Sequence, residues 1–244
     1  SPNLTGTAKV TVQLQDNRGT DNGGQDASAE QSFTITVKAV NDPPSFTKGA
    51  DQSVFEDAGK QTVANWATDL STGPANETTQ KLSFLVSSDN KALFAVQPAV
   101  SPAGTLTYTP AAQANGVATV TVKIQDNGGA TSGGVNSSAA QTFTITVNPV
   151  NDAPTFKKGA NVTVLEDSGA KSISKWATNI KSGPPNENAQ KVTFVLSNDN
   201  AALFLEQPAI SADGTLAFTP AGAQINGVAK VTVRLSADAK INSD

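Results

Sequence analysis

The chain has 244 residues with no cysteine, methionine or histidine, and its 17 basic and 21 acidic residues give a formal net charge of −4. These totals exclude disulfides, thiol chemistry, zinc sites built from Cys and His, and His-based catalytic triads. The acidic balance also argues against a nucleic-acid-binding surface, and no apolar run is long enough to span a membrane.

The first forty residues contain a polar loop followed by a strand pattern. The loop 16–26, DNRGTDNGGQD, holds three aspartates, namely Asp16, Asp21 and Asp26. A calcium site within this loop is one hypothesis, although the loop lacks the spacing and the distal Glu of an EF-hand. Turn formation is the alternative, because Asp caps turn backbones with its side chain. Residues 31–40, QSFTITVKAV, alternate apolar and polar side chains, which predicts a strand.

A linker and a Trp-containing segment follow this strand. In AVNDPPSF (39–46), Asn-Asp-x-Pro ends the strand and stiffens the next residues, because proline fixes its own φ and restricts the residue before it. We expect Phe46 to enter the top of the next core. Residues 61–70, QTVANWATDL, predict a single helical turn. Trp66 within them is predicted to be buried, and the alternative is an exposed platform for stacking sugars.

The remainder of this segment alternates with period two. The predicted strands are KLSFLVS (81–87), GTLTYTP (104–110), VATVTVKIQ (117–125) and FTITV (143–147). Alternation of this kind predicts antiparallel sheets with one solvated face. About seven short strands with Gly, Asn and Pro turns predict an all-β fold of immunoglobulin-like sandwiches.

The same motifs return at a fixed interval. Residues 41–110 recur without a gap as residues 151–220, and residues 1–40 recur as residues 111–150, with half of the aligned residues identical in each case. A period of this size indicates tandem domains of about 100 residues that each fold alone. We therefore predict the tail of one repeat at 1–40 (the first repeat), a complete repeat at 41–150 (the middle repeat) and a repeat without its last strand at 151–244 (the last repeat).

The order of these motifs resembles the cadherin-like tandem repeats of large bacterial surface proteins. The resemblance lies in FTITVxxVNDxPxF, VxxxxEDxG, Gly-Pro-x-Asn-Glu, LF…QPA…GTLxxTP and VTVxxQDNGG, and it covers all but the last eight or so residues. It implies an extracellular, non-enzymatic segment of the adhesin extender type, with calcium at or near the domain junctions. True cadherin linkers carry more acids, and here Ala39 and Pro149 stand two positions before the Asn-Asp pairs. The resemblance therefore implies fewer or weaker ions.

Calcium requires six to eight oxygen ligands, and each predicted junction offers carboxylates and amides. The candidate ligands of the first junction are Asp16, Asn41, Asp42, Glu56 and Asp57, and those of the second are Asp126, Asn151, Asp152, Glu166 and Asp167. Glu77 and Glu187, in the Gly-Pro-x-Asn-Glu segments, are parts of structural loops, additional ligands or part of a partner surface. The alternative for the Asp and Asn residues is turn formation without a metal ion.

Two other functions remain open at this stage. A sandwich without its last strand exposes unpaired backbone, so the strand 31–40 of a neighbouring molecule could complete the open end of 151–244 and build a fibre. A carbohydrate-binding module would need exposed aromatic side chains, and aromatics make up only 5% of the chain. Catalysis is not expected, since adjacent carboxylates at a turn are not an acid and base positioned across a cleft.

Overall fold

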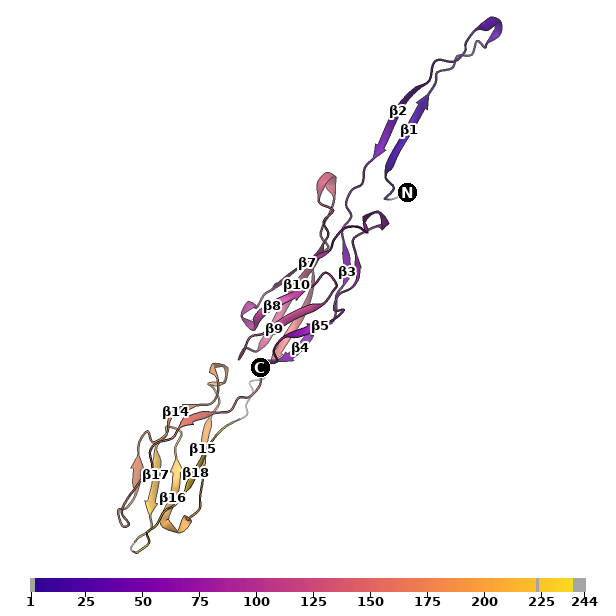
Figure 1. The fold of residues 1–244 in the computed structure, drawn as a ribbon. Coiled ribbons are helices and arrows are strands. Elements are labelled where there is room, and N and C mark those ends of the chain that lie inside the picture. Colours follow the sequence, from indigo (N-terminus) through magenta and orange to yellow (C-terminus); the bar gives the residue numbers. More distant parts are fainter. Residues whose placement is uncertain (1–2, 223, 239–244) are drawn as a thin grey trace.

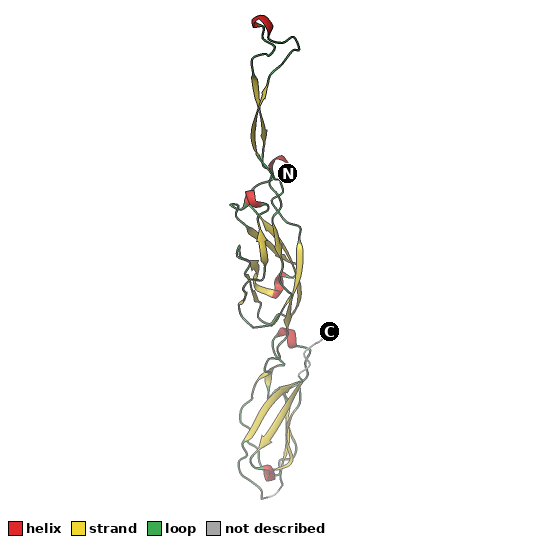
Figure 2. Ribbon diagram, turned by 90° about the vertical axis from the view of Figure 1, so that its right-hand side faces the viewer, coloured by secondary structure: helices red, strands yellow, loops and turns green. Residues whose placement is uncertain are grey.

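The computed structural model describes residues 3–222 and 224–238. These residues form 18 β-strands and six short 3-10 helices. Figure 1 shows three parts arranged end to end: a two-stranded hairpin and two sandwiches. Figure 2 shows the same elongated shape from the side, with strands running mostly along its length. The chain is therefore an all-β protein of tandem sandwiches, as the sequence predicted.

The first repeat contributes one hairpin. Its elements are β1 (Gly6–Val12), η1 (Asp21–Gly23) and β2 (Gln31–Val37). The antiparallel pair places Gly6 opposite Val37. In the middle repeat the corresponding strands place Gly116 opposite Val147, which is the same register one repeat later. Residues 1–40 thus fold like the matching end of the middle repeat, and the tip of the hairpin points away from the rest of the chain (Figure 1).

The middle repeat is a two-layered sandwich. Its strands are β3 (Ser45–Thr47), β4 (Gln52–Phe55), β5 (Gln61–Val63), β6 (Thr68–Ser71), β7 (Ser83–Ser88), β8 (Phe94–Val100), β9 (Leu106–Pro110), β10 (Gly116–Gln125) and β11 (Gln141–Asn148). Its 3-10 helices are η2 (Ala75–Glu77), η3 (Lys91–Leu93) and η4 (Thr131–Gly133). One sheet has the order β4-β11-β10-β7, and the other strands form the sheets β5-β9-β8 and β3-β6. All pairs are antiparallel except β4 and β11, which run parallel.

Alternating strand residues fill the space between the sheets of the middle repeat. Along β10 and β11 every second residue is buried, in agreement with the predicted period of two. Phe46 belongs to this core, as predicted, and is 7% exposed. Trp66 is 3% exposed, its ring centroid lies 4.4 Å from that of Phe143, and its Nε1 donates to the Ala50 carbonyl oxygen over 3.0 Å. The prediction that Trp66 belongs to the core is confirmed.

The helical turn predicted within 61–70 is wrong. Residues 61–63 form β5 and pair with β9, and residues 68–71 form β6 and pair with β3. Between them Asn65 has a φ of +54°, which lies outside the right-handed helical region. Strand partners on both sides therefore override the local helical pattern.

The last repeat keeps most of this arrangement. Its elements are β12 (Thr155–Lys157), β13 (Lys171–Ile173), β14 (Thr178–Lys181), η5 (Pro185–Glu187), β15 (Val192–Asn198), η6 (Ala201–Leu203), β16 (Phe204–Ile210), β17 (Leu216–Pro220) and β18 (Val231–Ala237). Residues 162–165 occupy the positions of β4 in the repeat but form no strand. The described residues contain no counterpart of β11, the strand on which β4 pairs. Part of the predicted open end, residues 239–244, lies outside the described residues.

The two repeats differ at one buried hydroxyl, which gives a testable prediction. Tyr108 is 1% exposed and its hydroxyl has no hydrogen-bond partner among the described residues, whereas the last repeat has Phe218 at this position. Burial also raises the pKa of the Tyr108 phenol. We expect Tyr108→Phe to stabilise the middle repeat by about 1 kcal/mol, because an unpaired buried hydroxyl is removed. Urea unfolding of both proteins measures this, and a loss of stability in the variant would indicate that the hydroxyl has a partner.

Candidate functional site

The junction between the middle and last repeats is organised around Glu56. Because β4 runs parallel to β11, the residue after β4 lies at the same end of the sheet as the linker that follows β11. The Glu56 backbone N–H donates to the Asn148 carbonyl oxygen over 2.8 Å, which extends this pairing by one residue. The Glu56 side chain is only 2% exposed. Its Oε1 accepts a hydrogen bond of 2.9 Å from the backbone N–H of Val150 in the linker.

Two further donors bring separate segments onto the same carboxylate. Asn115 Nδ2, from the loop before β10, lies 3.3 Å from Glu56 Oε2. Asn186 Nδ2, from η5 of the last repeat, lies 3.3 Å from each carboxylate oxygen. Glu56 therefore joins its own repeat, the linker and the next repeat through neutral amide donors. A buried carboxylate needs such partners, because burying an unpaired charge costs several kcal/mol or more.

A second carboxylate, Glu187, lies beside the linker on the last repeat. It is 7% exposed, and its Oε1 accepts a 3.0 Å hydrogen bond from the backbone N–H of Asp152. Gly183 makes room for it, since a Cβ at that position would lie 1.9 Å from Glu187 Oε2. The Gly-Pro-x-Asn-Glu sequence therefore has a local reason: the glycine accommodates the Glu side chain, and the Asn beside that Glu reaches Glu56.

Several oxygen atoms at this junction are buried without a hydrogen-bond donor among the residues that the structure describes. They are Asp152 Oδ2, Asn186 Oδ1 and Glu187 Oε2. Leaving a buried acceptor unpaired costs about 1–3 kcal/mol, and more when it is charged. A hard cation such as Ca²⁺ takes carboxylate and amide oxygens as ligands, so these three oxygen atoms fit calcium. Among the described residues, however, no three acidic side chains gather into a metal-binding group. A calcium ion here would need amide, backbone and water oxygens as well.

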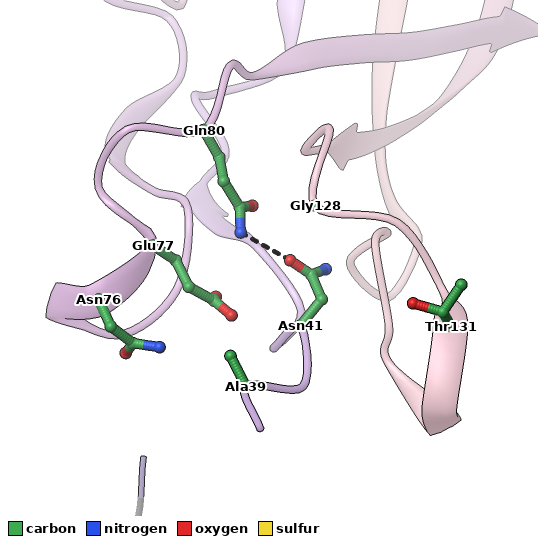
Figure 3. A pocket seen from close by; sticks show the side chains of 7 residues that line it. All are labelled: Ala39, Asn41, Asn76, Glu77, Gln80, Gly128 and Thr131. Carbon is green, nitrogen blue, oxygen red and sulfur yellow. Dashed lines mark hydrogen bonds between the residues drawn. The ribbon is translucent and has the colours of Figure 1, made fainter. Parts of the chain in front are cut away.

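The opposite end of the middle repeat holds the equivalent linker residues. Asn41 Nδ2 donates to Asp126 Oδ1 over 3.0 Å and to the Val135 carbonyl oxygen over 2.7 Å. Gln80 Nε2 donates to Asn41 Oδ1 over 2.7 Å, the bond drawn in Figure 3. The Asp42 backbone N–H donates to both oxygens of Glu77, which is 4% exposed. The linker is thus fastened to the repeat that follows it, through the amide of Asn41.

These contacts place two of the predicted ligands at a different junction from the one expected. Asp126 was expected at the second junction, but it binds Asn41 at the first. Glu56 was expected at the first junction, but it binds the linker of the second. The physical reason is the parallel pairing of β4 with β11, which places the Glu-Asp turn at the end of a repeat that faces the next one. The expected grouping therefore assigned Glu56 to the wrong end of its repeat.

The other predicted ligands lie apart from these groups or in turns. Asp16 lies in the loop between β1 and β2, where its Oδ1 accepts a hydrogen bond from the backbone N–H of Arg18. Asp57 adopts a φ of +61° in the turn after Glu56 and accepts from Gln113 Nε2. Glu166 and Asp167 are the counterparts of Glu56 and Asp57 in the last repeat, and both are exposed. Asn151 accepts from Gln190 as Asn41 does from Gln80.

The sequence did not single out Asn115 or Asn186, and it left three interpretations open for Glu187. One signal pointed to two of these residues: Gly, Pro, Asn and Glu of the Gly-Pro-x-Asn-Glu loop are identical in both copies. Asn115 had no comparable signal, because its role depends on the loop before β10 reaching the linker end of the sheet.

Comparisons with known proteins give only distant similarities. No protein-family model matches the chain, and no curated protein is significantly similar in sequence. The human desmocollin-1 ectodomain is 15% identical with a TM-score of 0.30, covering 94% of this chain and 43% of that ectodomain. Mouse protocadherin-24 EC1-3 is 13% identical with a TM-score of 0.41, covering 89% and 67%. Surface layer protein SbsC, domains 4–9, is 16% identical with a TM-score of 0.28, covering 95% and 33%. Similarities this low say nothing about function.

The described residues contain no helix that is both long and apolar enough to cross a membrane.

Proposed function

We propose that this chain is a non-catalytic spacer segment of an extracellular bacterial surface protein, in which calcium stiffens the junctions between sandwich repeats. The observation that supports it most is the junction at Glu56, where Asp152, Asn186 and Glu187 present buried oxygens without donors. End-to-end repeats joined by a short linker suit a protein part that holds another part at a distance (Figure 1). Bound calcium would neutralise these carboxylates and fix the angle between repeats.

Thermal unfolding tests this proposal. The intact chain is unfolded in millimolar calcium, in excess chelator and in magnesium as a control. A ligand present at 100 times its Kd stabilises the folded state by about 2.7 kcal/mol. For a domain of about 100 residues, 1 kcal/mol shifts the midpoint by roughly 4–8 °C, so we expect a calcium-specific rise on the order of 10 °C. An unchanged midpoint would show that the linker and the Glu-Asp turns are held by hydrogen bonds alone.

Fibre formation by strand exchange is the second candidate, and one observation favours it. Phe33, Ile35 and Val37 of β2 are each about half exposed. The matching residues of β11, Phe143, Ile145 and Val147, are at most 2% exposed. In the last repeat, β18 pairs on one edge with β15. Among the described strands only β15 pairs with β18, so the apolar face of β2 from one molecule would suit the other edge of β18 in another. Light scattering over a wide concentration range tests this, and a monomer at every concentration would contradict it.

Neither tryptophan provides the exposed aromatic surface that a carbohydrate-binding function would need. Trp66 is buried, and Trp176 is half-buried and packs against the core of the last repeat. The Trp176 Nε1 donates to the Ala160 carbonyl oxygen over 2.9 Å, as Trp66 does to Ala50. Both indoles therefore serve the fold of their own repeat.

A further inference from the structure

We propose that the Gly-Pro-x-Asn-Glu loop of each repeat is a docking site for the glutamate carboxylate of the repeat before it, and that this contact joins neighbouring repeats without a bound cation. The inference rests on the proposed role of the chain as a spacer, but it does not depend on calcium. In this chain the loop residue that makes the contact is Asn186, and the carboxylate that it binds is that of Glu56.

The hydrogen bond between Asn186 and Glu56 crosses from one repeat to the next. Within residues 3–222 and 224–238, it is the side-chain hydrogen bond that links the middle repeat to the last repeat. Asn186 Nδ2 lies 3.3 Å from both oxygens of the carboxylate, so one amide spans the two. Hydrogen bonds to ionised groups are stronger than neutral ones. The contact therefore restrains the last repeat against the middle one.

Glu56 is held ready for this contact by its own repeat. The Val150 N–H and Asn115 Nδ2 bind the carboxylate from the linker and from the loop before β10. These two donors fix the direction of the side chain, which is 2% exposed once the last repeat covers it. Asn186 then supplies the remaining donor. Without it, part of a buried carboxylate would lose a partner, which is unfavourable.

The matching loop of the middle repeat carries the same Gly, Pro, Asn and Glu residues. Asn76 occupies the position of Asn186, but it is exposed and the described residues give it no hydrogen bond, whereas Asn186 is half-buried under Glu56. Asn76 and Glu77 line a polar cavity of about 160 Å³ (Figure 3). Asn76 and Glu77 belong to one loop, and Ala39 and Asn41 lie on the other side of the cavity. By the same inference, Asn76 would bind the carboxylate of a Glu-Asp turn, as Asn186 binds that of Glu56.

The site also explains how a cation would enter the junction. Glu187 lies next to Asn186 and carries a second negative charge, and Asn186 Oδ1 is buried without a donor. Turning the Asn186 amide by half a turn would bring Oδ1 toward Glu56, which is favourable only with a cation between the two. The amide contact and the cation are therefore alternatives at one position, and the amide contact belongs to the ion-free state.

Spin-label distances between the two repeats test the inference in the intact chain. The sequence has no cysteine, so Lys123→Cys and Arg234→Cys provide two unique labelling sites on exposed, equivalent positions of β10 and β18. The distance distribution is measured in excess chelator for this labelled parent, for Asn186→Ala and for Asn76→Ala. Asn76→Ala is the matched control, because it removes the same side chain where no carboxylate is bound. Circular dichroism confirms that each variant is folded.

We expect a narrow distribution for the parent and for Asn76→Ala, and a distribution about twice as broad for Asn186→Ala, because repeats without a specific contact move relative to one another. Glu56→Gln should also broaden the distance distribution, because the side-chain amide of Gln would face the donors that now bind the carboxylate. Glu166→Gln should leave the distribution narrow. A narrow distribution for Asn186→Ala, or a broad one for the parent or for Asn76→Ala, would overturn the inference.

Repeating the distance and unfolding measurements with calcium separates this inference from the proposed function. If calcium changes neither the distribution nor the unfolding midpoint of the parent, the proposed calcium function fails, while the result in chelator still decides the contact between Asn186 and Glu56. If calcium narrows the broad distribution of Asn186→Ala, both the contact and the cation are supported as alternatives at one junction.

Discussion

Replacing Glu56 by Gln should remove most of the calcium-dependent rise in the unfolding temperature. The carboxylate lies at the junction between the middle and last repeats, and it binds the linker and the next repeat. Gln keeps the size of the side chain but loses the charge and one acceptor oxygen. At 100 times the Kd, the lost stabilisation would be about 2.7 kcal/mol, on the order of 10 °C in the midpoint. Scanning calorimetry with and without calcium measures it.

The chain supplies its own control for this experiment. Glu166 occupies the same motif position in the last repeat, but it is exposed and binds no described neighbour. Glu166→Gln should therefore keep the full calcium response. In chelator, Glu56→Gln should also be less stable than the parent by about 1–3 kcal/mol, because the new amide group faces the donors of Val150, Asn115 and Asn186. An equal calcium response in both variants would contradict the assignment of Glu56.

Replacing Trp66 by Ala should have the largest effect on the stability of the ion-free protein. The indole is 3% exposed, packs against Phe143 and donates to the Ala50 carbonyl oxygen. Removing a buried Trp typically costs about 3–5 kcal/mol, because the cavity is only partly refilled and the ring contacts are lost. We expect the middle repeat to unfold at a much lower urea concentration, as followed by far-ultraviolet circular dichroism.

Trp176→Ala is the matched substitution in the last repeat. Its indole is half-buried, so we expect a smaller loss, confined to the transition of the last repeat. Glycan binding is measured for both variants alongside stability. If Trp66→Ala left the fold intact and abolished binding to a polysaccharide, the sugar-stacking alternative would replace the core assignment.

Much of the fold was predictable because its causes are local. The alternation in FTITV predicted which residues of β11 are buried, and Asn-Asp-x-Pro predicted where the strand ends. Phe46 and Trp66 were predicted to be in the core because large aromatics fill sandwich interiors. The segment 61–70 was mispredicted because its conformation is set by pairing with β3 and β9, which are distant in sequence.

The candidate site was only partly predictable, for a reason of topology. Motifs identified the acidic residues, but the end of the sandwich at which each lies depends on strand direction. The parallel pairing of β4 with β11 brings Glu56 to the linker that follows, and no local pattern reveals it. The role of Asn186 required the contact between two repeats, which a sequence of one repeat does not contain. Only the identity of the Gly-Pro-x-Asn-Glu loops hinted at it.

A calcium titration of the chelator-treated, intact chain by calorimetry tests the central claim most directly. The account predicts saturable binding that is strongly weakened by Glu187→Gln, whose carboxylate oxygen is buried without a donor at the junction, and unaffected by Glu166→Gln. Magnesium should not compete at equal concentration, because it requires a near-ideal octahedral site and keeps its waters. No heat of calcium binding, or equal binding in both variants, would contradict a calcium-stiffened junction.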